Sequence, residues 1–171
     1  IQMKGTEPIH VKQFRLSPDQ RQAIEAWVSE MLRAGIIRPS DSAYCSPTFA
    51  VRKAVGWRIV HDYRRINART VISQPFCLRK EDIFDRMAGS QYFSTCDLLH
   101  GYYQQRMHPD DVQFTSFSTH LGQFEYLVMP QGLSGAPGSF NKMIQKIVKD
   151  LKISRSKSSR FHEKRQLNFS G

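Results

Sequence analysis

The sequence is poor in the residues and patterns that build disulfide frameworks, zinc clusters and membrane spans. It has three cysteines, Cys45, Cys77 and Cys96, an odd number with no C-x-x-C pair, and their wide spacing excludes a zinc cluster or a disulfide framework. No apolar run approaches the roughly 18 residues of a membrane span, and the first residues lack the basic-then-apolar pattern of a signal peptide. These absences predict a soluble protein of a reducing, intracellular compartment, cytoplasmic or nuclear, with no membrane partner.

Acidic residues are also scarce. There are 15 Asp and Glu against 25 Lys and Arg, which gives a formal net charge of +10. Such an excess predicts a polyanionic partner, because Lys and Arg side chains that neutralise phosphates release condensed counterions. From Lys149 onward, seven basic residues stand against two acidic ones, so this end carries +5, half of the total. Residues 152–171 are rich in Ser, Lys and Arg, a composition that predicts a disordered basic tail.

Local patterns predict one compact domain that mixes helices and strands. Residues 1–16 show no strong period and are expected to form an extended lead-in. Ser17, Pro18 and Gln20 have the pattern of a capping box, and apolar residues then recur at helical spacing until Gly35, which predicts a half-buried helix. The later patterns predict a hairpin over 48–51 and 57–61, a helix over about 80–87, strands over 92–98, 112–118 and 123–129, and a helix from Pro137 to about Leu151. This order favours an α+β fold.

Three blocks of sequence carry a resemblance to a known family. They are Gly35–Ser40 with Ser46-Pro47, then Trp57-Arg58 with Asp62–Arg64 and Asn67, and finally Tyr92–Tyr102 with Gln123–Pro137. Over about residues 4–151 the chain resembles the reverse transcriptase domain of long-terminal-repeat retrotransposons of the Ty3/gypsy type. The resemblance implies that residues 17–151 form reverse-transcriptase-like fingers and the front part of an incomplete palm.

The same resemblance implies a chemistry and a set of partners. The family adds deoxynucleotides to a primer on an RNA or DNA template, with carboxylates holding Mg²⁺ and basic groups steadying the triphosphate. Asp97 matches the family's first metal-binding aspartate and is the catalytic and metal-ligand candidate; without the flanking blocks, a strand or turn cap is the plainer reading. The rest of the polyprotein, namely the remaining palm, connection, RNase H and integrase, is implied as a lost partner.

Five residues match nucleotide-binding positions of the family. Arg58 matches the arginine on the incoming triphosphate, where a planar guanidinium makes bidentate phosphate contacts. Tyr102 matches the aromatic under the sugar, with core packing as the alternative. Gln131 and Gly132 match the lining of the nucleotide pocket, although a simple turn would satisfy them equally well. Lys53 is the counterpart of a second phosphate-binding cation, but its turn is one residue short, which leaves a solvated surface lysine as the other reading.

Three neighbouring residues are given plainer roles. Tyr103 is the residue that would exchange places with Tyr102 in the core. His61 and His100 stand where the family has other residue types, and we expect both to be partly exposed histidines, not metal ligands.

One expected motif is missing from the 171 residues. In the family a Tyr-x-Asp-Asp hairpin follows the last predicted helix and brings the other metal-binding carboxylates, whereas after Phe140 this sequence has no Tyr and no Asp-Asp pair. Glu163, alone in the predicted tail, lacks the rigidity to replace them. We therefore expect a chain truncated before that motif, inactive by itself and marginally stable, with an uncovered hydrophobic edge and face. The opening Ile1, in place of Met, also predicts a piece of a longer protein.

Three readings stay open at this stage. The first is a fragment of a retroelement RNA-directed DNA polymerase that is inactive as this chain. The second is a non-catalytic nucleic-acid-binding remnant or module that keeps a basic face. The third is a relic with no function.

Overall fold

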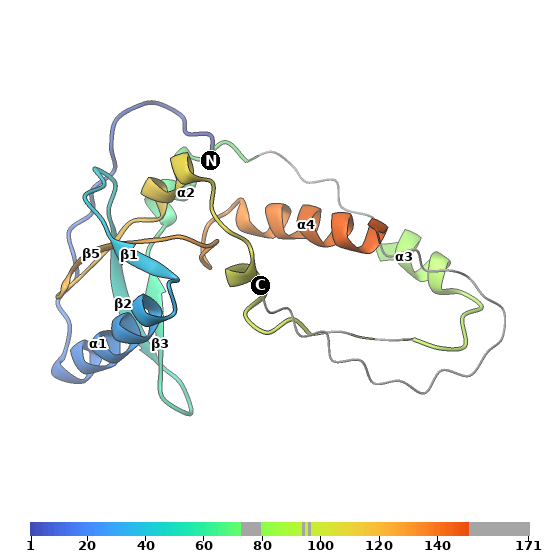
Figure 1. Ribbon diagram of the computed structural model, residues 1–171, viewed down its shortest axis with the longest axis horizontal. Coiled ribbons are helices and arrows are strands. Elements are labelled where there is room, and N and C mark those ends of the chain that lie inside the picture. The colour runs from blue at the N-terminus through green and yellow to red at the C-terminus, as the bar shows by residue number, and fades with distance from the viewer. Residues whose placement is uncertain (73–79, 94, 96, 151–171) are drawn as a thin grey trace.

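The computed structural model describes residues 1–72, 80–93, 95 and 97–150 (Figure 1). Cys77, Cys96 and the predicted basic tail over 152–171 lie outside these residues. In chain order the described elements are α1 (Pro18–Arg33), β1 (Ile37–Pro39), β2 (Ser46–Arg52), β3 (Trp57–His61), α2 (Arg64–Arg69), α3 (Lys80–Met87), the 3₁₀ turns η1 (Gly101–Gln104) and η2 (Pro109–Thr115), β4 (Phe117–Thr119), β5 (Gly122–Tyr126) and α4 (Ala136–Asp150). The mixture confirms the predicted α+β class.

Helix α1 begins at the predicted capping box. The backbone N–H of Gln20 donates to Ser17 Oγ at 3.3 Å, and the backbone N–H of Ser17 donates to Gln20 Oε1 at 2.9 Å. Gln20 Nε2 also donates to the carbonyl of Ala50 in β2 at 3.1 Å, so the helix start is tied to the sheet. Ile24 and Val28, one turn apart, are the buried residues of the helix, as its apolar period requires.

The five strands form one sheet in the order β1-β5-β4-β2-β3. The predicted hairpin is confirmed: β2 pairs antiparallel with β3, with Arg52 opposite Trp57, and β4 pairs antiparallel with β5. The central pairing is parallel, between Ser46 of β2 and Phe117 of β4. Strand β1, which local patterns did not predict, adds to the edge by pairing with β5.

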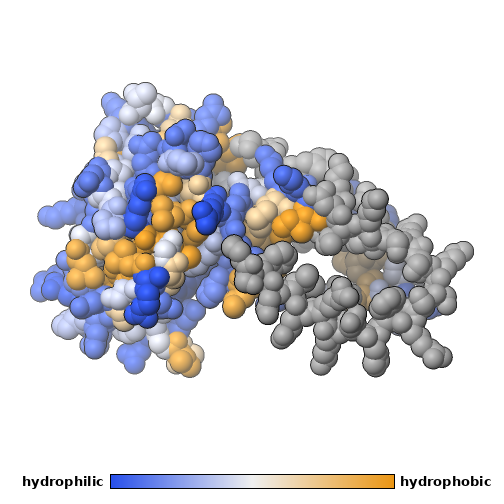
Figure 2. Space-filling view, viewed as in Figure 1, coloured by the Kyte–Doolittle hydropathy of each residue, from blue (hydrophilic) through white to orange (hydrophobic). Residues whose placement is uncertain are grey.

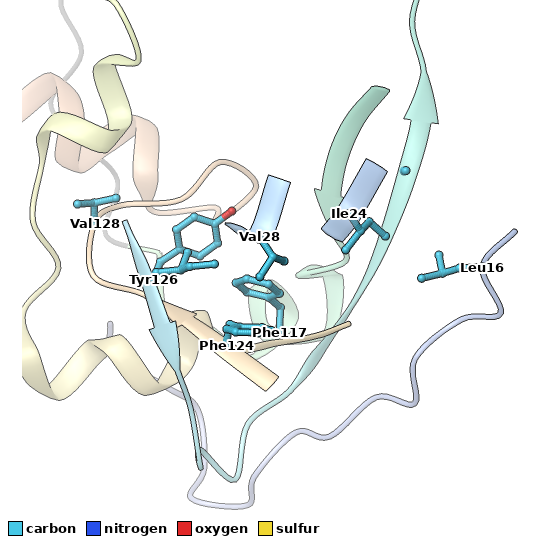
Figure 3. Packing of buried hydrophobic residues seen from close by; sticks show 9 residues of the cluster. Leu16, Ile24, Val28, Phe117, Phe124, Tyr126 and Val128 are labelled. Carbon is cyan, nitrogen blue, oxygen red and sulfur yellow. The ribbon is translucent and has the colours of Figure 1, made fainter. Parts of the chain in front are cut away.

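Two cores hold these elements together. The first lies between α1 and the sheet, where the aromatic rings of Phe117, Phe124 and Tyr126 meet Ile24 and Val28 (Figure 3). The second lies around α2 and combines residues from the lead-in, from the segment between β1 and β2, from α2 and its N-cap, and from the loop after β5 with the start of α4. Its members are Ile9, Tyr44, Tyr63, Ile66, Met129, Leu133 and Ala136. The lead-in is therefore packed: Ile9 is buried, and Cys45 N–H donates to its carbonyl at 2.8 Å.

Two predicted strands are wrong. The strand predicted over 112–118 is mostly the 3₁₀ turn η2, and only its end enters β4. The reason is local, because Pro109 fixes a turn-compatible φ and His108 Nδ1 accepts from Asp110 N–H at 3.4 Å, which favours a helical start. Over 92–98, none of the described residues is in a strand. The described side chains of this stretch are exposed, Tyr92 to 91% and Phe93 to 61%.

Candidate functional site

Arg58 and Gln131 come into direct contact although 73 positions separate them. Arg58 lies on β3 opposite Val51 of β2, and Gln131 lies in the loop between β5 and α4. Arg58 Nη2 donates to Gln131 Oε1 at 2.9 Å, and both side chains are exposed. A guanidinium has five N–H donors in a planar fork, and this bond uses one of them. The pair thus presents a cation and a side-chain amide together at one surface.

Gly132, beside Gln131, has a backbone conformation that suits glycine. Its φ is +98°, in the left-handed region, where a side chain adds strain. A Cβ built there would lie 3.4 Å from Tyr63 Cδ2. Within the chain, the neighbour of this position is therefore the buried Tyr63 ring.

Tyr102 and Tyr103 point into different cores. Tyr102 is half-buried and meets Phe140 of α4 edge to face, with ring centroids 5.2 Å apart. Tyr103 packs against the first core beside Tyr126, and burial raises the pKa of its phenol. Gly101 precedes them at the same contact, since a Cβ there would lie 3.0 Å from the Phe140 ring.

Asp97 is exposed and outside any strand. A metal site needs several donors converging on one point. Among residues 1–72, 80–93, 95 and 97–150, no group of three or more His, Cys, Asp or Glu side chains is placed to hold a metal ion. In the described part of the chain, Asp97 therefore has no neighbouring group of carboxylates or imidazoles with which to hold a metal ion.

Lys53 lies in the turn between β2 and β3. Its side chain is exposed, and its backbone N–H donates to Gly56 O at 3.0 Å, closing the turn. It borders a hollow of about 410 Å³ between this turn and α1, together with Asp19 and Trp57. The guanidinium carbon of Arg52, Cζ, lies 5.9 Å from the Trp57 ring centroid. Lys53 therefore sits at the hairpin tip as predicted, among residues of α1 and the turn.

The expectation that His61 is partly exposed is wrong. His61 is 8% exposed, with Nδ1 2.9 Å from Thr48 Oγ1 and Nε2 2.8 Å from the Tyr126 hydroxyl. Its ring also lies 4.0 Å from that of Phe117. Burial lowers the pKa of His61 from 6.5 to about 3, because the core disfavours the charged form. The sequence held a signal, since Trp57, Ile59 and His61 alternate along β3 as one strand face does.

His100 is an exposed loop residue, as predicted. Its φ of 49° and ψ of 42° place it in the left-handed region, immediately before η1. Asn67 belongs to the second sequence block, and the sequence assigns it no role. Its side chain in fact bonds to the loop that carries Gln131 and Gly132.

Comparison with known proteins identifies the family of the chain. Residues 51–169 match the family model described as reverse transcriptase (RNA-dependent DNA polymerase). The retrovirus-related Pol polyprotein from transposon 297 of Drosophila melanogaster is 37% identical over 150 residues, which are 84% of this chain and 14% of that protein. The corresponding polyprotein from transposon gypsy of the same species is 29% identical over 88% of this chain and 15% of its own length.

A solved structure extends the likeness to the fold. The crystal structure of the prototype foamy virus protease-reverse transcriptase, as the CSH mutant, superposes with a TM-score of 0.74 at 25% identity. The match covers 85% of this chain and 20% of that one. This chain therefore spans a fifth or less of each of these proteins. With the family model, the transposon relatives and the foamy virus fold in agreement, the chain belongs to the reverse transcriptase (RNA-dependent DNA polymerase) family, with gypsy-type retrotransposon relatives.

Proposed function

We propose that this chain supplies the fingers and the front part of the palm of a retrotransposon RNA-directed DNA polymerase, and that Arg58 and Gln131 receive an incoming deoxynucleoside triphosphate. The contact between these two side chains, at 2.9 Å, carries the proposal. A guanidinium held at one N–H keeps its other donors for phosphate oxygens, which it binds in bidentate fashion. Gln131 supplies a neutral amide beside that charge, suited to the sugar or base.

A test of nucleotide binding follows from the exposure of the pair. Titration of the chain with dTTP, followed by NMR, is expected to shift the resonances of Arg58 and Gln131. Arg58→Ala and Gln131→Ala should each weaken binding, by about tenfold for the charged contact. The matched control is Arg21→Ala, an exposed arginine of α1, which should leave the affinity unchanged. Equal losses in Arg21→Ala and Arg58→Ala would contradict a specific pocket.

The described residues alone do not supply enough ligands for the metal ions of such a polymerase. Mg²⁺ takes oxygen ligands in near-octahedral geometry, and Asp97 supplies one carboxylate. The 171 residues contain no Tyr-x-Asp-Asp motif. The residues present therefore do not fit a complete magnesium site, and further carboxylates have to come from another segment.

We therefore expect the 171-residue chain to be inactive by itself. The measurement is dTTP incorporation by primer extension on a poly(rA) template with an oligo(dT) primer and Mg²⁺. Incorporation should not exceed that of the Asp97→Asn variant. Incorporation that depends on Asp97 would show that the chain completes a metal site unaided.

A second candidate function is non-catalytic binding of nucleic acid. The net charge of +10 favours it, because neutralised phosphates release counterions. The affinity for an RNA/DNA hybrid should then fall steeply as the salt concentration rises. If the tail contributes in proportion to its charge, a variant ending at residue 150 should show about half the slope of log affinity against log salt concentration. A flat salt response would exclude a phosphate-driven footprint.

A further inference from the structure

The loop after β5 receives two hydrogen bonds from one side chain, the amide of Asn67. Asn67 Nδ2 donates to the carbonyl of Gly132 at 2.8 Å, and Asn67 Oδ1 accepts from the backbone N–H of Ser134 at 2.8 Å. A carbonyl can only accept and a backbone N–H can only donate. The two partners therefore fix which end of the amide faces which residue, and the amide spans the loop from Gly132 to Ser134.

Asn67 is itself held firmly by α2. Its neighbour Ile66 is 1% exposed in the second core. The backbone N–H of Asn67 donates to Tyr63 O at 2.8 Å, and the Tyr63 hydroxyl donates to Thr115 O at 2.6 Å. The Asn67 side chain thus starts from a backbone that packing and hydrogen bonds have already ordered.

The loop needs such a support at this point. Met129 and Leu133 are buried on either side of the exposed Gln131 and Gly132. Glycine has more backbone freedom than any other residue, and Gly132 takes up an unusual φ of +98°. The hydrogen bonds from Asn67 hold Gly132 and Ser134, in the half of the loop that precedes α4.

We propose that Asn67 is a positioning residue for the nucleotide pocket: it holds the loop in the conformation in which Gln131 meets Arg58. Asn67 acts through Gln131 and is given no contact with the nucleotide. The expected effect of Asn67 on nucleotide binding rests on the proposed function. Its expected effect on the contact between Gln131 and Arg58 rests only on the two hydrogen bonds of Asn67.

The first experiment measures that contact without any nucleotide. In the otherwise unchanged chain, Arg58→Lys should shift the side-chain amide resonances of Gln131, because the planar donor at 2.9 Å is lost. In an Asn67→Ala background the same Arg58→Lys change should shift them little or not at all. A shift of the same size in both backgrounds would overturn the inference.

A conservative variant separates the two bonds of Asn67. Asn67→Asp keeps an acceptor for the Ser134 N–H and removes the donor to Gly132 O. Hydrogen exchange at the Ser134 amide should stay slow in Asn67→Asp and become about fivefold or more faster in Asn67→Ala. Asn141→Ala, an exposed asparagine of α4, is the control. Equal exchange rates in Asn67→Ala and the unchanged chain would overturn the inference. If Asn67→Ala fails to fold, Asn67→Asp, which lacks the Gly132 bond, replaces it as the background of the first experiment, and a Gln131 shift of unchanged size there would overturn the inference.

The second experiment is a double-mutant cycle on dTTP affinity. If Asn67 acts through Gln131, Asn67→Ala and Gln131→Ala should each weaken dTTP binding by about five- to tenfold, and the double variant should be no weaker than the worse single variant. Additive losses would overturn the positioning role. If the unchanged chain shows no dTTP binding, the proposed function fails, and the resonance and exchange measurements still decide the role of Asn67.

Discussion

At the scale of single residues, His61 shows how tertiary packing sets a chemical property. The imidazole is buried against Phe117 and bonded at both nitrogens, to Thr48 and Tyr126. A neutral imidazole has one donor and one acceptor nitrogen and can satisfy both partners. Protonation would place a charge in the core, which is why the pKa of His61 falls to about 3.

This burial makes stability depend on pH. Between about pH 3 and 6.5 the folded His61 stays neutral while the unfolded one binds a proton, so unfolding takes up a proton and the free energy of unfolding falls as the pH falls. The contribution is fully present above pH 6.5. His61→Gln should flatten this decline, as measured by urea unfolding at a series of pH values.

The exposed His120 provides the control, since His120→Gln should keep the wild-type pH slope. Asp62 acts in the same direction, because its hydrogen bond from Arg64 lowers the pKa of its carboxyl, but it is present in all three proteins. The same slope in wild type and His61→Gln would mean that His61 is not held neutral in the folded chain.

Gly132 offers a backbone test in the candidate site. Gly132→Ala should lower the free energy of unfolding by about 1–2 kcal/mol, because an L side chain at a φ of +98° is strained. The new methyl group would lie at van der Waals distance from Tyr63, 3.4 Å from Cδ2, so the backbone strain is the main cost. Gly135→Ala, in the same loop but with open space around its Cβ position, is the control and should cost less in urea unfolding. The reverse order would contradict the strained geometry of Gly132.

The sequence predicts some residues of the site but not the contacts between them. Resemblance selected Arg58 and Gln131, and the structure joins them. No local pattern could predict their contact, because a separation of 73 positions is bridged only by the sheet and the second core. The bonds of Asn67 were missed for the same reason, since hydrogen bonds from a side chain to a distant loop leave no period in the sequence.

At the scale of elements, local signals succeeded where the element is specified locally. The capping box at Ser17 and the apolar period of α1 act within the helix, and the helix starts where they predict. The wrong strand over 112–118 has two apolar residues at strand spacing, Val112 and Phe114, yet Pro109 and the His108 cap form a 3₁₀ turn instead. A strand needs a partner at its edge, and the described residues of 92–98 have none.

The capping box can be tested by Ser17→Ala. Loss of the Oγ acceptor at 3.3 Å leaves the Gln20 N–H without its partner, and the expected loss of stability is about 1 kcal/mol in urea unfolding. Ser29→Ala in the middle of α1 is the matched control: its Oγ donates to Glu25 O, and alanine is the better helix former there. Equal destabilisation by the two variants would show that the cap contributes nothing special.

At the scale of the whole molecule, the described apolar residues are unevenly covered. The sheet and α1 enclose a closed core, whereas several large apolar side chains over residues 84–99 face solvent: Phe84 68%, Tyr92 91%, Phe93 61% and Leu99 80%. Figure 2 also shows apolar side chains at the surface where α4 lies in Figure 1, and Ile147 of that helix is 44% exposed. None of the described helices is long and apolar enough to cross a membrane. Exposed apolar surface of this kind favours association.

The exposed apolar side chains over residues 84–99 are expected to make the chain associate. The chain at high concentration should associate and bind the dye ANS, and Tyr92→Ser with Leu99→Ser should reduce both, because these two side chains are 91% and 80% exposed. Val55→Ser is the matched control, since Val55 is also 91% exposed but stands at the tip of the β2–β3 turn, apart from residues 84–99 in the sequence. Sedimentation velocity over a concentration series measures the association. If Val55→Ser reduced association as much as the double variant does, any exposed apolar side chain would be responsible. If neither variant reduced association, residues 84–99 would not form an association surface, and a covering segment would find no apolar face there.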